Sequence, residues 1–160
     1  MPPRNRVEPD RPVSNVESVE ARHGGCLCGA VRYRVDGPLR GVVNCHCSQC
    51  RRTSGHFVAA TAARKDDLTV TVTTGLRWYR SSEKARRGFC GTCGSSLFWE
   101  ADSGERIAIM VGTLDAPTGL RTVAHIFVAD AGDYYDLDDD LEKLAAGSYG
   151  ETLPLGRSDG

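Results

Sequence analysis

Cysteine is the residue type in this chain whose number and spacing could do chemistry. The seven cysteines form three tight clusters: C-x-C at 26–28, C-x-C-x-x-C at 45–50 and C-x-x-C at 90–93. An odd number of cysteines fits a disulfide framework poorly. Close spacing is typical of metal sites, because thiolates on one turn or one strand face can reach the same ion. The pattern therefore predicts metal binding, with zinc as the expected ion.

The first and third clusters together offer the four ligands that structural zinc requires. Cys26 and Cys28 are two residues apart, so in a strand their side chains share one face. The sequence Cys-Gly-Thr-Cys-Gly at 90–94 has the spacing of a zinc knuckle, in which glycine lets the backbone turn tightly around the metal. We therefore expect a closed, structural zinc site made by Cys26, Cys28, Cys90 and Cys93.

The middle cluster has three cysteines left over, namely Cys45, Cys47 and Cys50. Three protein ligands leave one position of a tetrahedral zinc open, which is typical of catalytic sites. A zinc with three thiolates is electron-rich and activates water poorly, but it suits a fourth thiolate from a ligand. We interpret these three cysteines as catalytic residues at an open site, which makes two zinc ions per chain.

Other ligand sets remain open at the level of spacing. The middle cluster could be closed by a histidine and be purely structural; the candidates are His46, His23, His56 and His125. The ligands could also be divided differently, with Cys26 and Cys28 joining Cys45 and Cys47. Iron could replace zinc at a thiolate site.

Basic residues near the middle cluster are candidates for substrate binding. Arg51 and Arg52 directly follow Cys50 and could bind carboxylates of a thiol cosubstrate, since guanidinium groups pair well with carboxylates. A solvated basic surface is the alternative for both. His56 could move a proton near the open metal. Lys84, Arg86 and Arg87 could join the same basic patch, but a solvated strand edge is the favoured interpretation.

Short strands must position these residues. Alternating apolar residues and turn signals predict strands over 30–35, 41–45, 57–63, 68–73, 76–81, 85–89, 96–100, 106–114 and 125–128. A helical turn is expected over 47–53, and the Asp-rich segment 136–140 predicts the start of a short C-terminal helix ending near 146. Strands without long alternating helices indicate an all-β fold of antiparallel sheets. The predicted domain is 23–146, between a disordered tail at 1–22 and a second tail at 147–160.

Composition limits the partners that we expect. The chain has 160 residues and a formal net charge of -1, so it suits one domain and has no basic field to attract nucleic acid. No apolar run is long enough to span a membrane. The first residues contain prolines and charges without an apolar signal segment, so we expect a cytoplasmic location.

The three cysteine clusters also carry a family resemblance. The stretches GGCLCGAVRYRV (24–35), NCHCSQCRRTSG (44–55) and FCGTCGSSLFW (89–99), with a looser match at HIFVAD (125–130), resemble the glutathione-dependent formaldehyde-activating enzymes and their centromere-protein-V-like branch. The resemblance implies a zinc-stabilised, tent-like β fold with the same division into a four-cysteine and a three-cysteine zinc site. The segment GDYYDLDDD at 132–140 departs from the family, whose members more often carry a tryptophan there.

The resemblance implies a carbon–sulfur lyase that forms S-(hydroxymethyl)glutathione from glutathione and formaldehyde. The expected partners are a small thiol such as glutathione and a small electrophile. The alternative function is a non-catalytic, zinc-built β module that binds a protein partner. A middle cluster with an open ligand position favours the enzyme, whereas a cluster closed by a histidine favours the binding module.

Overall fold

Strands make up most of the regular structure. The computed structural model describes residues 20–147 and 153–156. Within them the strands are β1 (Arg22–Gly25), β2 (Arg32–Val35), β3 (Val42–Cys45), β4 (Val58–Arg64), β5 (Leu68–Val72), β6 (Leu76–Ser82), β7 (Ala85–Cys90), β8 (Ser96–Ala101), β9 (Arg106–Met110), β10 (Thr122–Ile126) and β11 (Glu142–Leu144). The helical elements are α1 (Ser48–Ser54) and three 3-10 turns, η1 (Lys65–Asp67), η2 (Val111–Thr113) and η3 (Val128–Asp130).

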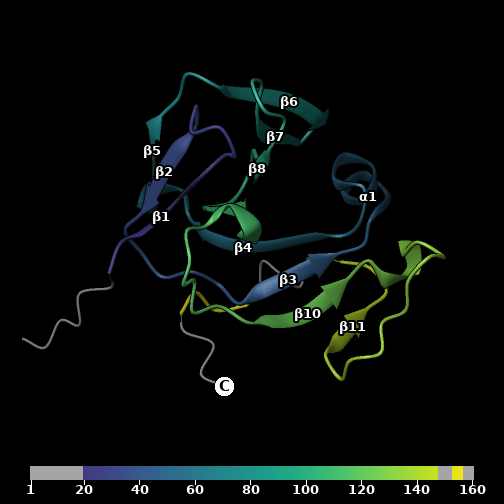
Figure 1. Ribbon diagram of the computed structural model, residues 1–160. Helices are drawn as coiled ribbons and strands as arrows, with labels where there is room; N and C mark the ends of the chain where they lie inside the picture. The colour runs from purple at the N-terminus through teal and green to yellow at the C-terminus, as the bar shows by residue number, and fades with distance from the viewer. Residues whose placement is uncertain (1–19, 148–152, 157–160) are drawn as a thin grey trace, which may run out of the picture.

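The strands form two sheets that lean against each other (Figure 1). The smaller sheet has the order β1-β2-β5, and the larger has the order β11-β10-β3-β4-β9-β8-β7-β6. The larger sheet curves, so that β6 and β7 lie at the opposite end of the molecule from β3 and β10, while α1 stands at the open side between them (Figure 1). The all-β prediction is confirmed. The pairing is antiparallel except where β10 runs parallel to both β3 and β11.

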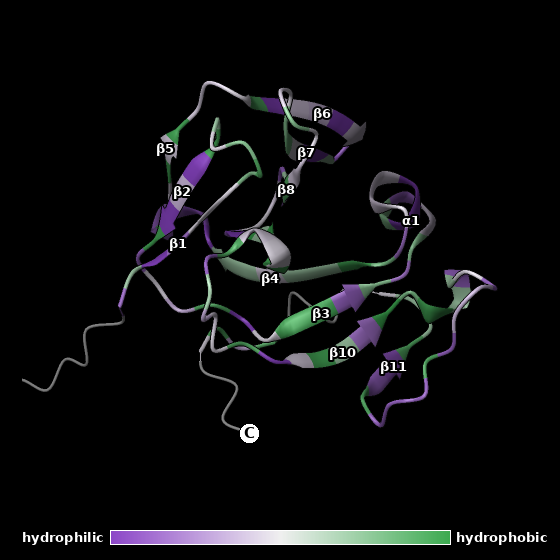
Figure 2. Ribbon diagram, viewed as in Figure 1, coloured by the Kyte–Doolittle hydropathy of each residue, from purple (hydrophilic) through white to green (hydrophobic). Residues whose placement is uncertain are grey.

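The main core lies between the two sheets. Val31, Tyr33 and Val35 alternate along the segment of β2 and are almost fully buried, as period-two patterning requires. The Tyr33 ring meets Phe98 of β8 edge-on, with 5.2 Å between centroids. Figure 2 shows that β3 and β4 are mostly hydrophobic, whereas β2 and β11 carry many hydrophilic residues. Burial of one face of each sheet therefore holds the two sheets together.

The C-terminal helix is the main error of the sequence-based prediction. The segment 136–146 forms no helix; its last part is β11, which pairs in parallel with β10. The Asp139 carboxylate accepts a hydrogen bond from the Leu141 amide at 3.1 Å and binds His125, so it shapes a turn instead of capping a helix. The free edge of β10 then offers this segment the hydrogen bonds that a helix would have supplied.

Both predicted tails are only partly described. Residues 1–19 lie outside the described residues, and β1 begins at Arg22, one residue before the predicted domain. In the predicted C-terminal tail, Leu155 forms an isolated bridge with Arg40, and the Gly156 amide donates to the Leu39 carbonyl at 3.1 Å. The domain boundaries otherwise stay a prediction.

The predicted helical turn after β3 is confirmed as α1, which has seven residues. In the described part of the chain, no helix is long and apolar enough to cross a membrane.

Replacing Leu97 by alanine should test the core. Leu97 lies in β8 and is fully buried, so Leu97→Ala removes buried methylene groups and leaves a cavity. We expect the free energy of unfolding in urea to fall by about 2–5 kcal/mol. The matched control is Val72→Ala on β5, a partly exposed site, where the loss should stay below about 1 kcal/mol. Equal losses at the two positions would contradict this description of the core.

Candidate metal centres

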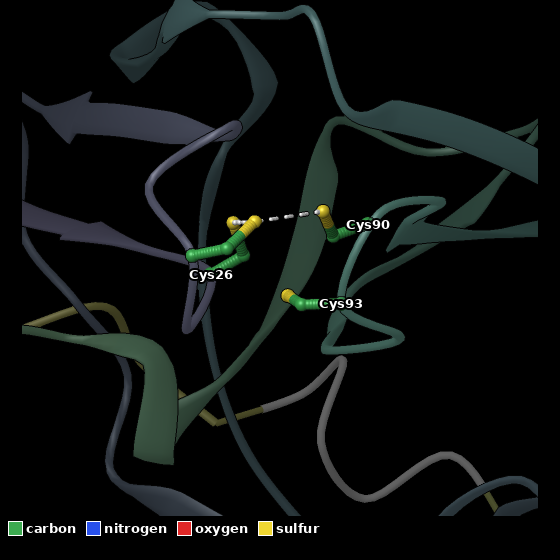
Figure 3. A group of neighbouring side chains, drawn as sticks. Cys26, Cys90 and Cys93 are labelled. Atoms are coloured by element: carbon green, nitrogen blue, oxygen red, sulfur yellow. Dashed lines mark hydrogen bonds between the residues drawn. The ribbon is translucent and has the colours of Figure 1, made fainter.

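Four cysteines from distant parts of the chain meet at one point. Cys26 and Cys28 lie in the turn that follows β1, while Cys90 ends β7 and Cys93 lies in the turn after it. Their sulfur atoms all lie within 4.8 Å of one another. Figure 3 shows the side chains of Cys26, Cys90 and Cys93 pointing toward a common centre. The structure thus brings together the four residues that spacing predicted for the structural site.

The two cysteine turns have the same construction. The Gly29 amide donates to the Cys26 carbonyl at 3.3 Å, and the Gly94 amide donates to the Cys90 carbonyl at 2.8 Å. Both glycines have a φ near the left-handed region, 81° for Gly29 and 80° for Gly94, which residues with a Cβ adopt only at a cost. Each turn is therefore shaped so that two sulfur atoms face the same side of the backbone.

The sulfur geometry fits a tetrahedral zinc ion. A Zn–S bond of about 2.3 Å at tetrahedral angles places neighbouring sulfur atoms about 3.8 Å apart. The Cys26 and Cys28 sulfur atoms are 3.6 Å apart, and those of Cys28 and Cys90 are 3.8 Å apart. The Val31 amide donates to the Cys26 sulfur at 3.2 Å, and the hydroxyl and then the backbone of Ser95 lower the pKa of Cys93 to about 5. Both effects favour the thiolate form, which is the form that binds metal.

The remaining three cysteines form a second group at the junction of β3 and α1. Cys45 is the last residue of β3, Cys47 is the N-cap of α1, and Cys50 lies in its first turn. The Cys47 sulfur accepts a hydrogen bond from the Cys50 amide at 3.4 Å, as an N-cap side chain does. The three sulfur atoms lie within 4.8 Å of one another, and no described histidine, aspartate or glutamate joins them. Among the described residues this group therefore has three ligands, which fits an open metal site.

Arg87 gives this three-cysteine group its electrostatic environment. Its Nη1 and Nη2 atoms lie 3.9 Å and 3.8 Å from the Cys50 sulfur, and Nη2 also donates to the Gln49 side chain at 3.3 Å. The hydrogen bond from Cys45 and, against the effect of burial, the charge of Arg87 lower the pKa of Cys50 to about 6. The same hydrogen bond raises the pKa of Cys45. The group therefore concentrates negative charge on Cys50, next to a fixed cation.

The histidines that could have closed this group point elsewhere. His46 is fully buried, and its ring nitrogens contact the Tyr135 hydroxyl at 2.6 Å and His125 Nδ1 at 2.8 Å. Burial lowers the pKa of His46 to about 4, so its ring is neutral. His56 packs against Phe57, 4.2 Å between ring centroids. Neither is available as the fourth ligand in this conformation.

A cleft of about 290 Å³ is lined by neighbours of both cysteine groups, although no cysteine is part of its lining. Thr53 of α1, Val58 of β4 and Arg87 of β7 line it beside Cys50, and Gly94 lines it beside Cys93. Val58 packs in the same apolar cluster as Cys50. A ligand in this cleft would therefore lie against the charged edge of the three-cysteine group.

The three predicted substrate-binding residues lie outside the lining of this cleft. Arg51 and Arg52 lie on α1, with Arg52 exposed, and His56 belongs to an aromatic cluster with Tyr134 and Tyr135. Their role in substrate binding stays a prediction. Arg87 was a candidate for the basic patch, but the favoured interpretation, a solvated strand edge, did not predict its contact with Cys50. The one sequence signal for this contact was the alternation along β7, in which Arg86 and Arg87 point to opposite faces of the sheet.

The two cysteine groups should respond differently to mutation. In reduced, zinc-supplied protein, Cys90→Ser should unfold the domain, because structural zinc binding contributes on the order of 10–16 kcal/mol in small zinc domains. Cys50→Ser should keep the fold and lose only the second metal. Circular dichroism and metal content per chain would measure both effects. The same loss of structure in both variants would show that this division of roles is wrong.

Comparisons with known proteins show which family the chain belongs to. The family model of the glutathione-dependent formaldehyde-activating enzyme matches residues 21–130, which include all seven cysteines. A protein from Schizosaccharomyces pombe, named as an uncharacterized lyase, is 28% identical over 117 residues, which are 71% of this chain and 82% of that protein.

A candidate glutathione-dependent formaldehyde-activating enzyme from Halomonas elongata is 34% identical over 83 residues, 47% of this chain and 53% of its own. A crystal structure of a Rhodobacter sphaeroides protein aligns with a TM-score of 0.50 and 34% identity, over 59% of this chain and 88% of that one. Because the family model spans well over half of the sequence, the chain belongs to the glutathione-dependent formaldehyde-activating enzyme family.

Proposed function

We propose that this protein is a lyase-type enzyme of carbon–sulfur bond chemistry. Its reaction would join a thiol, glutathione, to formaldehyde or a related small electrophile, as an S-(hydroxymethyl)glutathione synthase does. The observation that carries the proposal is the three-cysteine group, which has no fourth ligand among the described residues. Arg87, which contacts Cys50, connects it to a cleft. The names of the family and of its relatives support the same reaction class.

The donor set determines which chemistry a metal would add. A zinc ion held by Cys45, Cys47 and Cys50 would supply an open position at which a thiol is bound in its deprotonated form. Its net charge would be negative with three thiolates, so a further thiolate is repelled unless a cation lies near. Arg87 is that cation, at 3.8–3.9 Å from the Cys50 sulfur.

Arg87 would bind and orient the sulfur of the substrate. The Nε atom of Arg87 is shielded from solvent and has no hydrogen-bond partner among the described residues. The side chain also lines the cleft, so its charge acts on a ligand there. In such a site of low polarity, a charge-assisted hydrogen bond contributes about 1.5–3 kcal/mol.

The bond changes balance without an oxidant or a reductant. The thiol loses its proton, its sulfur attacks the carbonyl carbon of formaldehyde, and a C–S bond forms while the C=O π bond breaks. The carbonyl oxygen takes up a proton, which gives a hemithioacetal. The protein would contribute thiolate formation and proximity of the two reactants.

The size of the cleft agrees with a small electrophile and the thiol end of a peptide. Its volume of about 290 Å³ is at the lower end of small-molecule sites. The cysteinyl part of glutathione would lie inside, and the rest of the tripeptide would extend over α1. Its carboxylates would then pass near Arg51 and Arg52, which is the role that the sequence predicted for them.

The reaction itself can be measured by NMR. Magnetisation transfer between free and hydroxymethylated glutathione reports the rate of their exchange in the presence of formaldehyde. We expect zinc-loaded protein to accelerate this exchange above the spontaneous rate, and Cys50→Ser, which keeps the fold, to return it to that rate. If the wild-type protein with both metals in place gave no acceleration, a non-catalytic binding module would be the better description.

Replacing Arg87 by methionine should weaken thiol binding. Arg87→Met keeps the length of the side chain and removes its charge, so we expect KM for glutathione to rise about 10- to 100-fold, the equivalent of one charged hydrogen bond. Arg64→Met is the matched control, because Arg64 is an exposed arginine of β4 outside the cleft lining. A KM that is unchanged in Arg87→Met, or equally raised in Arg64→Met, would contradict the role of Arg87.

A further inference from the structure

His46, which lies between Cys45 and Cys47 in the sequence, belongs to a continuous chain of polar side chains. Each member is within hydrogen-bond distance of the next: 2.6 Å from the Tyr135 hydroxyl to His46 Nδ1, 2.8 Å from His46 Nε2 to His125 Nδ1, and 2.9 Å from His125 Nε2 to Asp139 Oδ2. His46 is 0% exposed and His125 2% exposed. We call these four side chains the relay.

One set of proton positions satisfies every donor of the relay. The Asp139 carboxylate accepts from His125 Nε2–H, which leaves Nδ1 of His125 as an acceptor for His46 Nε2–H. His46 Nδ1 is then an acceptor for the Tyr135 hydroxyl, whose oxygen accepts from the Gly132 amide at 3.3 Å. If the hydrogen bonds ran in the reverse direction, His46 Nδ1–H would donate to the Tyr135 oxygen, and the Tyr135 hydrogen would have no acceptor in the relay. Both histidines are therefore assigned as Nε2–H tautomers.

The backbone is bent to bring the relay together. The His46 amide donates to the carbonyl of Ile126 at 2.9 Å, at the end of β10. The next residue, Phe127, has φ 55° and ψ 41°, a left-handed conformation that costs a residue with a Cβ about 1–2 kcal/mol. The chain then turns back through η3, and the loop 131–141 delivers Tyr135 and Asp139. Backbone strain of this kind tends to persist where a particular geometry is needed.

The relay acts on the segment that carries two of the three cysteines. His46 lies between Cys45 and Cys47, and its ring is bound to Tyr135 and His125 instead of joining the sulfur atoms. A closed four-cysteine site constrains its own sulfur atoms, but a three-cysteine site lacks the fourth ligand that would do so. The orientation of this segment must therefore be fixed by contacts other than the metal ligands.

An apolar core would serve stability equally well, because buried polar groups gain little net free energy even when they are fully hydrogen-bonded. The hydrogen bonds of the relay are directional. They fix the orientation of the His46 ring and the position of the backbone from which it extends.

We propose that the relay is a positioning device for the three-cysteine group. It holds the 45–47 segment so that the sulfur atoms converge with one position free. This inference rests on the proposed metal–thiol function, since its purpose is to shape that site. Tyr135 and Asp139 lie outside the lining of the cleft and are positioning residues.

The existence of the relay can be tested by NMR without metal chemistry. Long-range 1H–15N spectra of the full chain should show His46 and His125 as Nε2–H tautomers. In Tyr135→Phe, which removes only the hydroxyl, the Nδ1 signal of His46 should shift as its hydrogen bond is lost. Histidine signals that are identical in wild type and Tyr135→Phe would overturn the relay.

The positioning role requires a second readout, which is the zinc affinity of each cysteine group. Stepwise chelator competition on zinc-loaded protein resolves the two sites, and Cys50→Ser identifies the step of the three-cysteine group. Tyr135→Phe and Asp139→Asn should weaken that step about tenfold, as losses of supporting hydrogen bonds around metal ligands do, and leave the four-cysteine step unchanged. The controls are Tyr134→Phe and Asp138→Asn, at two exposed residues outside the relay.

Each possible result of the zinc-affinity measurement either supports or contradicts the positioning role. Selective weakening at the three-cysteine group, with both controls like wild type, supports the positioning role. Equal weakening of both steps together with a lower unfolding temperature would reduce the relay to ordinary core packing, and no weakening would overturn it. A wild-type protein that took up a single zinc would overturn the relay's role and the open site together. If selective weakening occurs but no glutathione exchange is accelerated, the relay stands and the proposed reaction falls.

Discussion

Cys26 and Cys28 converge with Cys90 and Cys93 and thereby connect the two sheets. Their convergence joins the turn of the small β1-β2-β5 sheet to the β7–β8 turn of the large sheet, across more than sixty residues of chain. Sulfur separations of 3.6 and 3.8 Å match the edges of a ZnS4 tetrahedron. Because β7 also carries Arg87, this junction places the cation that faces Cys50.

The second cysteine group uses the same ligand chemistry for a different end. At the first group, two turns closed by glycine present four sulfur atoms and leave no position for a ligand. At the second, a strand end and a short helix present three. Arg87, which lines the cleft, contacts Cys50, and the His46 side chain binds Tyr135 and His125. In our proposal, the free position, the nearby positive charge and the hydrogen bonds of His46 together suit the exchange of a thiol and not permanent closure.

Local patterns predicted what depends on neighbours in sequence. The spacing of the cysteines indicated the grouping that the structure shows, and alternation located most strands within one or two residues. Contacts between segments that are distant in sequence could not be predicted from such patterns. The pairing of His46 with His125 spans 79 residues, and the approach of Arg87 to Cys50 spans 37, so both depend on strand order and register. The Asp-rich segment has the composition of a helix start, but tertiary bonds of Asp139 and the free edge of β10 override that local preference.

We propose that one cysteine group is closed and that the other accepts an external thiolate. Cadmium-113 NMR of the fully loaded, reduced protein distinguishes the two groups, because cadmium prefers thiolate ligands and its chemical shift reports the number of sulfur atoms bound. Two resonances are expected, and glutathione should move only the one that is missing in Cys50→Ser, toward the position of the four-thiolate site. Two resonances that both stay in place when glutathione is added would contradict the claim.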